Sequence, residues 1–312
     1  MSEQSKIGVV GAGLMGHAVA LLFALKDYPV FLFDKNQDVL EIAPAKIRTD
    51  FGPFLDLGLV TPDDVERSLS NIRLCSSLED VTSNAGLVIE AVSENLSLKQ
   101  RLFSEMEKYA GNDAVFCSNT SAISITLIAE SLERKERLVG THFWNPPHIV
   151  PLVEVIKSKY TSEQVFESTY QLMKRIGKRP VKVLRDVPGF LGNRMQHALW
   201  REAISLVQKG IATPEGIDEV VKFGFGLRTP FLGPLETADL AGLDLTQEVH
   251  KDLLPHLENT AKPLSILVEM VEKGDLGAKT GRGFHEWSKM KLEQVIEERD
   301  SFLLRIVQLI SR

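Results

Sequence analysis

Short apolar runs alternate with longer amphipathic stretches over residues 6–184. The apolar runs are rich in branched and aromatic side chains, which is typical of buried strands. They begin at residues 6, 30, 71, 87, 115, 138, 152 and 179, with sequences such as KIGVV, VFLFD, LVIEAV and LVGTHF. Several intervening stretches have helical periodicity, and the clearest begins after the N-cap candidate Thr161, with Gln164 three residues on, and ends at Gly177. This alternation predicts strands laid parallel and joined by helical crossovers.

The pattern changes after residues 186–189, because no further strand-like run follows. The remaining segments have helical periodicity interrupted by Gly and Pro, and they cover 190–210, 214–224, 236–254, 263–273 and 289–311. We therefore predict an α/β fold, with a doubly wound sheet domain over residues 1–187 and an all-helical domain over residues 188–312. The apolar positions of the last segment can pack within the chain or against a second subunit.

Composition and charge narrow the class of protein. The chain has 312 residues, 44% of them hydrophobic, and its 36 basic and 42 acidic side chains give a net charge of −6, which disfavours partners such as nucleic acid or an anionic membrane surface. No apolar run approaches the roughly 18 residues of a membrane span, and the opening MSEQSKIGVV has no export-signal pattern. The two cysteines, Cys75 and Cys117, form no CxxC motif. We therefore expect a cytoplasmic protein with no disulfide framework and no bound metal.

A glycine-rich turn is the strongest local motif. It reads Gly11, Ala12, Gly13, Leu14, Met15, Gly16, directly after a predicted strand and at the start of a predicted helix. In this context the glycines permit a tight turn, close approach of a pyrophosphate and packing of helix on strand, while the helix N-terminus favours the phosphates. The second strand ends in Asp34, whose carboxylate can accept hydrogen bonds from ribose hydroxyls and would repel a 2′-phosphate. The motif predicts a Rossmann-like site that prefers NAD to NADP. The neighbouring Lys35 softens this preference without reversing it.

Further cofactor contacts are expected where the predicted strands at 87 and 115 end. Residues 91–95 lie between the strand at 87 and the helix that contains Lys99, at a switch-point position where a nicotinamide or its ribose could lie. We therefore include Glu94, Lys99 and, after the strand at 115, Asn119 among the candidate cofactor residues. A first-turn carboxylate and a solvated lysine are alternative interpretations of Glu94 and Lys99.

The candidate for acid–base chemistry is His142, at the end of the strand that begins at 138. A histidine suits the removal of a proton from an alcohol as hydride leaves. Twelve residues on, Glu154 lies in the next predicted strand, where it could bond the far imidazole nitrogen and stabilise the imidazolium. Each residue alone would more often be structural, and their pairing on adjacent strands favours a catalytic dyad.

Together with the glycine turn, five further segments make the chain resemble the L-3-hydroxyacyl-CoA dehydrogenase family. They are SNTSAISI at 118–125, GTHFWNPP at 140–147, LVEVIKS at 152–158, DVPGFLGNR at 186–194 and KTGRGF at 279–284. The resemblance implies that His142 is the general base and Glu154 its partner, and that Ser121 and Asn193 hydrogen-bond the reacting oxygen. It also implies an N-terminal Rossmann-like domain, a helical dimerisation domain and a homodimer.

Two segments differ from the acyl-CoA members of that family. HFWNPPHIVPLVEV at 142–155 and GFGLRTPFLGPLET at 224–237 look more like the branch that contains lambda-crystallin, an L-gulonate 3-dehydrogenase, and a pyridine-alcohol dehydrogenase. The substrates of that branch are small free carboxylates. Arg228 could bind such a carboxylate through two parallel hydrogen bonds, and His148 could be a second hydrogen-bond donor to it. The alternative is a solvent-exposed arginine and a loop histidine. Between residues 36 and 70 the only basic side chains are Lys46, Arg48 and Arg67, which argues mildly against binding of a polyanionic CoA tail.

The leading hypothesis is an NAD-dependent dehydrogenase that transfers hydride from the hydroxyl of a 3-hydroxy acid, with a preference for a small free carboxylate. One alternative is an L-3-hydroxyacyl-CoA dehydrogenase of fatty-acid metabolism. A second alternative, from a different class, is a non-catalytic protein that binds NAD as a structural or sensor module. The four residues with an implied catalytic role are all chemically competent, which counts against the second alternative.

Overall fold

The computed structural model describes residues 6–310, and the chain divides into two units, Met1–Arg194 and Met195–Arg312. The boundary predicted at 187/188 lies earlier, in the segment before helix α9 (Gly192–Gln208). The division falls later because the first turn of α9 is tied to the first unit: the backbone N–H of Gly192 and the side chain of Asn193 both donate hydrogen bonds to residues of that unit.

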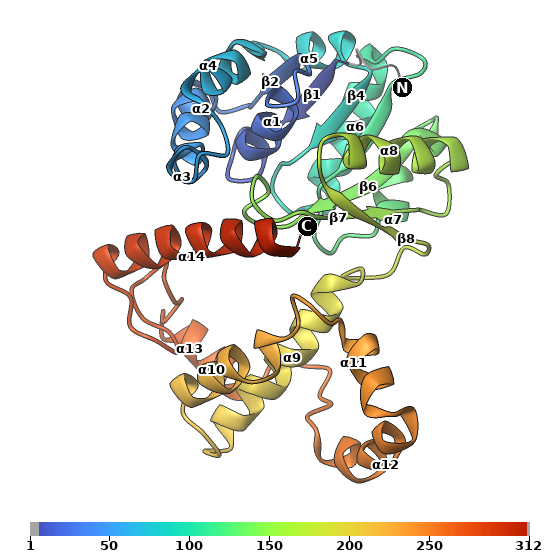
Figure 1. Ribbon diagram of the computed structural model, residues 1–312. Coiled ribbons are helices and arrows are strands. Elements are labelled where there is room, and N and C mark those ends of the chain that lie inside the picture. The colour runs from blue at the N-terminus through green and yellow to red at the C-terminus, as the bar shows by residue number, and fades with distance from the viewer. Residues whose placement is uncertain (1–5, 311–312) are drawn as a thin grey trace. The chain divides into compact units, whose positions relative to one another are not determined.

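The first unit is built on an eight-stranded sheet in the order β3-β2-β1-β4-β5-β6-β7-β8 (Figure 1). Its strands are β1 (Ile7–Val10), β2 (Val30–Phe33), β3 (Ile72–Leu74), β4 (Leu87–Glu90), β5 (Val115–Ser118), β6 (Leu138–Phe143), β7 (Leu152–Ile156) and β8 (Arg179–Val183). All eight predicted strands are therefore confirmed, as is the α/β fold class. The strand order reverses between β1 and β4, so the loops after these strands border the crevice where α/β folds bind ligands.

The expectation that all strands run parallel was wrong for the last two. Strand β7 pairs with β6 in the antiparallel direction, and β8 is parallel to β7. The connection from β6 to β7 spans only residues 144–151, whereas a parallel crossover needs a dozen or more residues. The antiparallel register places His142 directly opposite Glu154.

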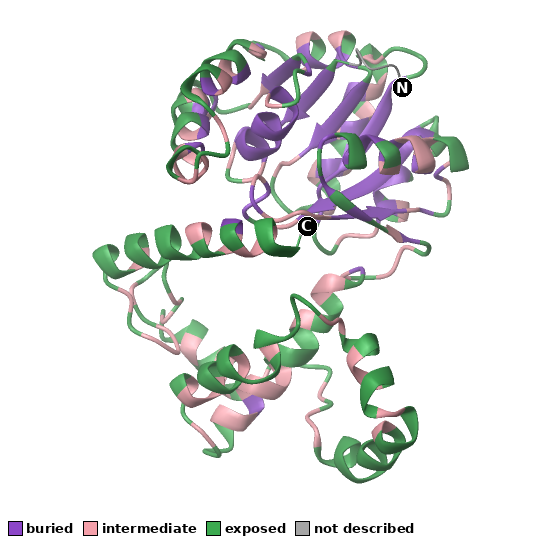
Figure 2. Ribbon diagram, in the orientation of Figure 1, coloured by how far each residue is buried: buried purple, intermediate pink, exposed green. Residues whose placement is uncertain are grey.

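Helices cover both faces of the sheet, and each face has its own apolar core (Figures 1 and 2). On one face lie α1 (Gly16–Ala24), α2 (Gln37–Asp50), α3 (Gly52–Asp56), α4 (Pro62–Ser70) and α8 (Glu163–Arg175), and on the other α5 (Leu78–Asn84), α6 (Leu96–Tyr109) and α7 (Ile125–Ala129); a short helix η1 (Lys135–Arg137) precedes β6. Successive strand residues point to opposite faces, so Val9 packs in one core and Val10 in the other. The N-cap of α8 is Ser162 rather than the predicted Thr161, whose hydroxyl donates to the Leu138 carbonyl instead.

The second unit consists of helices, with no strand among its described residues. After α9 come α10 (Pro214–Phe223), η2 (Phe225–Leu227), α11 (Pro234–Ala241), α12 (Leu243–Leu253), η3 (Leu254–His256), α13 (Ser265–Glu272) and α14 (Lys289–Ile310). The helix expected over 236–254 is divided at Gly242, which has a φ of 96°. A left-handed glycine ends a helix readily, because it lacks the Cβ that makes this conformation costly. Among the described helices, none is long and apolar enough to span a membrane.

Candidate active site

The glycine turn between β1 and α1 has the form that the sequence predicts. Gly11 has a φ of 101°, and a Cβ added there would lie 2.6 Å from the Ala91 carbonyl oxygen; at Gly16 it would lie 1.6 Å from the Gly11 oxygen. Both positions therefore require glycine for the turn itself. At Gly13 an added Cβ meets nothing within 4 Å, so the protein's own packing does not require that glycine. This open backbone is where a dinucleotide pyrophosphate can approach.

The surroundings of the turn fit an anionic dinucleotide. Helix α1 has no side-chain cap at Met15 and no acidic residue in its first turn, so no side chain of the helix itself occupies its positive end. Asp34 is fixed at the end of β2, because its two carboxylate oxygens accept hydrogen bonds from the backbone N–H groups of Ala12 (2.7 Å) and Asn36 (2.8 Å). Each oxygen keeps a second lone pair for a ribose hydroxyl. Leu14, within the turn, is 66% exposed.

Lys99 is buried rather than solvated. Its side chain is 1% exposed, and its Nζ lies 2.6 Å from Glu90 Oε1 and 3.3 Å from Glu94 Oε2. Glu90, also fully buried, accepts a further hydrogen bond from the Ser118 hydroxyl. The interpretation of Lys99 as a surface residue is therefore wrong. A direct contact from its ammonium to a cofactor would require these ion pairs to open, and that contact stays a prediction.

Glu94 holds the loop that follows β5. Its Oε1 accepts hydrogen bonds from the Thr120 hydroxyl (2.6 Å) and from the backbone N–H groups of Ser121 (3.0 Å) and Ala122 (3.1 Å). Burial raises the pKa of Glu94, but the Thr120 hydrogen bond, Lys99 and the Ala122 N–H together bring the pKa below its usual value. The carboxylate is therefore ionised at neutral pH and fixes the backbone on both sides of Ser121.

The predicted dyad forms across β6 and β7. His142 Nδ1 lies 2.8 Å from Glu154 Oε2, and both side chains are buried. A carboxylate only accepts, so Nδ1 carries the proton and the lone pair of the neutral imidazole lies on Nε2. The rings of Trp144 and Phe190 flank the imidazole, with centroids 5.5 and 5.6 Å away. The imidazole thus has the tautomer and the support that a general base requires.

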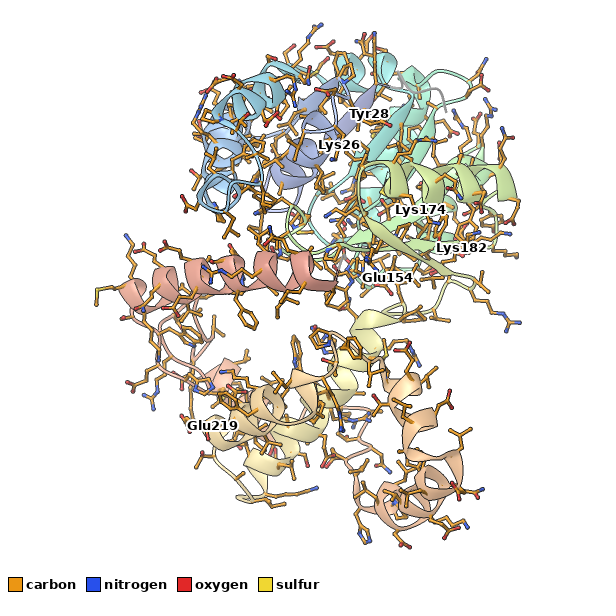
Figure 3. All side chains as sticks on the ribbon, in the orientation of Figure 1. Lys26, Tyr28, Glu154, Lys174, Lys182 and Glu219 are labelled. Atoms are coloured by element: carbon orange, nitrogen blue, oxygen red, sulfur yellow. The ribbon has the colours of Figure 1, made fainter. Side chains whose placement is uncertain are left out.

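Glu154, on β7 (Figure 3), accepts four hydrogen bonds. Besides His142, Trp144 Nε1 donates to Oε2 at 3.3 Å, and the backbone N–H groups of Leu191 (2.8 Å) and Gly192 (3.0 Å) donate to Oε1. Burial raises the pKa of Glu154, but the bonds from His142, Gly192 and Leu191 outweigh it and hold the pKa below its usual value. The dyad therefore contains a carboxylate, not a carboxylic acid, at neutral pH.

Ser121 and Asn193 join the same network. Asn193 Nδ2 donates to the Ser121 carbonyl at 2.8 Å, and Asn193 directly follows Leu191 and Gly192, which hold Glu154. The side chain of Asn119 accepts from the Phe143 N–H at 2.9 Å, which ties the end of β5 to the residue after His142. The structure thus connects His142, Glu154, Ser121 and Asn193 through hydrogen bonds within the first unit. Their catalytic roles stay a proposal.

The two predicted substrate donors lie in different surroundings. His148 lies between β6 and β7, with its Nδ1 3.7 Å from Asp50 Oδ2 and its side chain 8% exposed. Arg228 is exposed and lies in the second unit, directly after η2. A contact of either residue with substrate stays a prediction.

Two contacts were not predicted from the sequence: Trp144 as a donor to Glu154, and the pairing of His148 with Asp50. Trp144 lies in the segment 142–155 that differs from acyl-CoA members, but no sequence pattern gave it a role. No motif or spacing in the sequence pointed to Asp50, because the end of α2 meets the 144–151 segment only in the folded chain. Among the described residues, no group of three or more His, Cys, Asp or Glu side chains is arranged to hold a metal.

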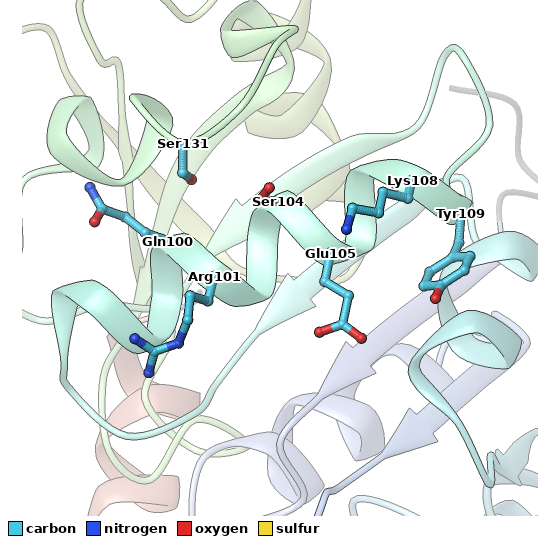
Figure 4. A pocket seen from close by; sticks show the side chains of 7 residues that line it. All are labelled: Gln100, Arg101, Ser104, Glu105, Lys108, Tyr109 and Ser131. Atoms are coloured by element: carbon cyan, nitrogen blue, oxygen red, sulfur yellow. The ribbon is translucent and has the colours of Figure 1, made fainter.

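A surface hollow of about 480 Å³ on α6 lies outside the candidate site (Figure 4). Its lining side chains are Gln100, Arg101, Ser104, Glu105, Lys108, Tyr109 and Ser131. None of them belongs to the network around His142.

Comparisons with known proteins agree with this geometry. Residues 6–187 match the family model "3-hydroxyacyl-CoA dehydrogenase, NAD binding domain", and residues 189–287 match "3-hydroxyacyl-CoA dehydrogenase, C-terminal domain". The chain is 32% identical over 300 residues to 5-formyl-3-hydroxy-2-methylpyridine 4-carboxylate 5-dehydrogenase of Mesorhizobium japonicum, covering 96% of each chain. It is 36% identical over 293 residues to human mitochondrial hydroxyacyl-coenzyme A dehydrogenase, covering 90% of each.

A solved structure described as 5-formyl-3-hydroxy-2-methylpyridine 4-carboxylic acid 5-dehydrogenase, an NAD⁺-dependent dismutase, is similar over the whole chain. It has a TM-score of 0.92 and 31% identity, and the match covers 99% of both chains. The glycine turn, the dyad and the matched family models together lead to one conclusion. The chain belongs to the 3-hydroxyacyl-CoA dehydrogenase family and is an NAD-dependent dehydrogenase.

Proposed function

We propose that this protein oxidises the hydroxyl group of a small 3-hydroxy acid that carries a free carboxylate, with His142 as the general base. The observation that carries the proposal is the hydrogen bond from His142 Nδ1 to Glu154, which leaves Nε2 with the lone pair. NAD, when bound, supplies the hydride acceptor. The chain's own part in the reaction is to orient the alcohol, remove its proton and stabilise the charge that results.

His142 Nε2 takes the hydroxyl proton, and the imidazolium that forms is stabilised by the ionised Glu154 across the 2.8 Å bond. Ser121 and Asn193 are the groups that we assign to hydrogen bonds with the reacting oxygen. The support for this assignment is that Glu94 and Asn193 fix the backbone of Ser121 on both sides, through its N–H and its carbonyl. A donor held in this way needs little reorganisation when charge develops on the oxygen.

The α2–α4 region favours a free acid over a CoA thioester. Of its basic side chains, Arg48 is paired with Glu66, and Arg67 is paired with Asp64 and Asp27. These arginines are therefore already neutralised by acidic partners, and little net positive charge remains to attract CoA phosphates. The similar pyridine carboxylate dehydrogenase, named for a small free acid, agrees with this preference. We propose Arg228 as the anchor of the substrate carboxylate.

A 3-hydroxyacyl-CoA substrate is the second candidate, because the human hydroxyacyl-coenzyme A dehydrogenase is 36% identical. A panel of free 3-hydroxy acids and 3-hydroxyacyl-CoAs, assayed with NAD by NADH absorbance, separates the two candidates. We expect turnover of a free acid, and expect Arg228→Ala to raise its KM by about 10- to 100-fold, the loss of one charge-assisted bidentate contact. Turnover of acyl-CoAs alone, unaffected by Arg228→Ala, would instead establish the second candidate.

The role of His142 is tested by His142→Gln. We expect kcat to fall by about 10² to 10⁴ while the Kd of NAD changes little, because the imidazole acts on the alcohol and not on the cofactor. Unchanged turnover would remove the dyad from the mechanism.

We further propose that the protein is a homodimer. Helices α10, α11, α12 and α13 contain no buried residue, and the described residues of the second unit that are buried are Ser205 and Leu304 (Figure 2). Large side chains such as Phe223, Leu235 and Phe231 are 76–85% exposed. So little buried core favours further apolar contacts, and we propose a second copy of the chain as the partner that covers these side chains. Light scattering should give twice the chain mass; a monomeric mass would exclude the dimer.

For the compartment, we propose the cytoplasm. Cys75 and Cys117 are both unbonded, as is usual in a reducing environment. Imaging of the tagged protein tests this, with mitochondria as the contrary outcome, since the human relative is mitochondrial.

A further inference from the structure

Two histidines and a carboxylate form a cluster beside the glycine turn, in which the two imidazoles are nearly buried and the Asp50 side chain is 20% exposed. His17 Nδ1 lies 2.5 Å from the Gly13 carbonyl oxygen, and His17 Nε2 lies 3.1 Å from Asp50 Oδ2. His148 Nδ1 lies 3.7 Å from the same Asp50 oxygen. Asp50 Oδ2 is itself buried, and His17 is 5% exposed. The cluster is separate from the dyad, and the proposed reaction gives it no role.

The three residues come from segments that are far apart in the sequence. His17 lies in the first turn of α1, and its contact with Gly13 ties it to the cofactor-binding turn. Asp50 is the last residue of α2. His148 belongs to the 144–151 segment, which directly connects the strand of His142 to the strand of Glu154. One carboxylate thus lies between the cofactor turn and the segment that carries both dyad strands.

The same segment is held from a second direction. Lys178, which is 7% exposed, donates from Nζ to the carbonyl oxygens of Pro147 (2.5 Å) and Val150 (2.9 Å), on both sides of His148. Burial lowers the pKa of Lys178 to about 7. The His148 ring also packs against Phe54 of α3, with centroids 6.0 Å apart. Lys178 holds the backbone of this segment, and the His148 side chain lies at Asp50. The segment therefore has little freedom to shift relative to α1.

A displacement of that segment would matter for hydride transfer. A misplacement of the reacting groups by about 1 Å can reduce the rate roughly 10²-fold. Asp50 Oδ2 is buried, and its neighbours at 3.1 and 3.7 Å are two imidazoles, groups that can carry positive charge. The carboxylate is thus placed where it can hold the two halves of the site at a fixed spacing.

We propose that His17, Asp50 and His148 form a positioning bridge, which sets the cofactor turn at Gly13 relative to His142. The inference rests on the proposed role of His142 as the base. It assigns His148 to the bridge rather than to the substrate carboxylate. None of the three residues touches the reacting atoms; they act through Gly13 and through the 144–151 segment.

The test uses Asp50→Asn, His148→Gln and the double variant in the full-length protein. Asn has nearly the shape of Asp but carries no charge. We expect each single variant to lower kcat by about 10- to 100-fold, with the Kd of ADP-ribose and the KM of the hydroxy acid within about twofold of wild type. Because both residues serve one bridge, the double variant should be no slower than the slower single variant. Asp56→Asn, an exposed carboxylate at the end of α3, is the matched control and should leave kcat unchanged.

Three outcomes would overturn the bridge. The first is Asp50→Asn with the same activity as Asp56→Asn. The second is His148→Gln with a raised KM for the hydroxy acid alone, additive to the effect of Asp50→Asn. The third is a lowered melting temperature that accounts for every change in kcat. If wild type converts no substrate of the panel, the proposed function fails, and the bridge is then judged by the fluorescence of bound NADH. In that case Asp50→Asn and His148→Gln should both alter the emission, and Asp56→Asn should not; equal emission in all three overturns the bridge.

Discussion

Replacing Glu154 by Gln tests the dyad most sharply, because all four of its contacts are donors. Trp144 and His142 face Oε2, while Leu191 and Gly192 face Oε1. A glutamine offers one oxygen and one NH₂, so two of the four donors must face another donor. The side chain can therefore adopt one of two orientations, and the structure decides between them.

If the amide oxygen faces His142, the two backbone N–H groups lose their acceptor, at a cost of about 1–3 kcal/mol each. If the oxygen faces Leu191 and Gly192, only the Trp144 N–H is left without an acceptor, because His142 can move its proton from Nδ1 to Nε2 and accept from the amide. The second orientation costs about 1–3 kcal/mol in total and is therefore preferred. It also leaves Nε2 protonated, so His142 can no longer act as a base.

We therefore expect Glu154→Gln to lower kcat by about 10⁴, the effect of a wrong histidine tautomer, with only about 1–3 kcal/mol lost in the free energy of unfolding. Steady-state NADH formation and urea unfolding measure the two quantities. Glu130→Gln, at an exposed glutamate after α7, is the control and should match wild type in both. A kcat within tenfold of wild type, or a large loss of stability with normal kcat, would refute the reasoning.

Three further perturbations address the same region. Gly192→Ala puts a Cβ 2.2 Å from Trp144 Cζ2 and should lower the free energy of unfolding in urea by about 1–3 kcal/mol. Gly111→Ala, where the Cβ meets nothing within 4 Å, is the control and should lower it far less. Equal losses in the two variants would contradict the packing argument. Trp144→Phe removes one of the two donors to Glu154 Oε2, so kcat should fall by less than in Glu154→Gln, and a larger fall would show that the indole does more than support the carboxylate. Folding lowers the pKa of Glu154, so its ionised carboxylate stabilises the fold above the unfolded pKa of about 4.3, and this stabilisation is lost as the pH falls through the folded-state pKa. The difference in unfolding free energy between wild type and Glu154→Gln should therefore narrow from pH 7 towards pH 3. A constant difference would show that the charge of Glu154 contributes nothing to stability.

The strands and the class of chemistry could be predicted from the amino-acid sequence alone. Hydrophobic periodicity located all eight strands, because a buried strand needs a short apolar run whatever surrounds it. The glycine turn was equally readable, since the close approaches at Gly11 and Gly16 admit no other residue. The candidates His142 and Glu154 followed from residue type and from their places on consecutive strands.

How these parts meet depends on long-range packing and could be read only from the folded chain. The antiparallel direction of β7, which puts Glu154 opposite His142, came from the pairing of whole strands and not from their composition. The burial of Lys99 between two glutamates, and the meeting of Asp50 with His17 and His148, join residues that no local pattern connects. Hydrophobic periodicity indicates which face of an element is buried, whereas long-range packing sets the partner of a buried charged group. The contacts that hold the site residues in place could therefore be seen only in the folded chain.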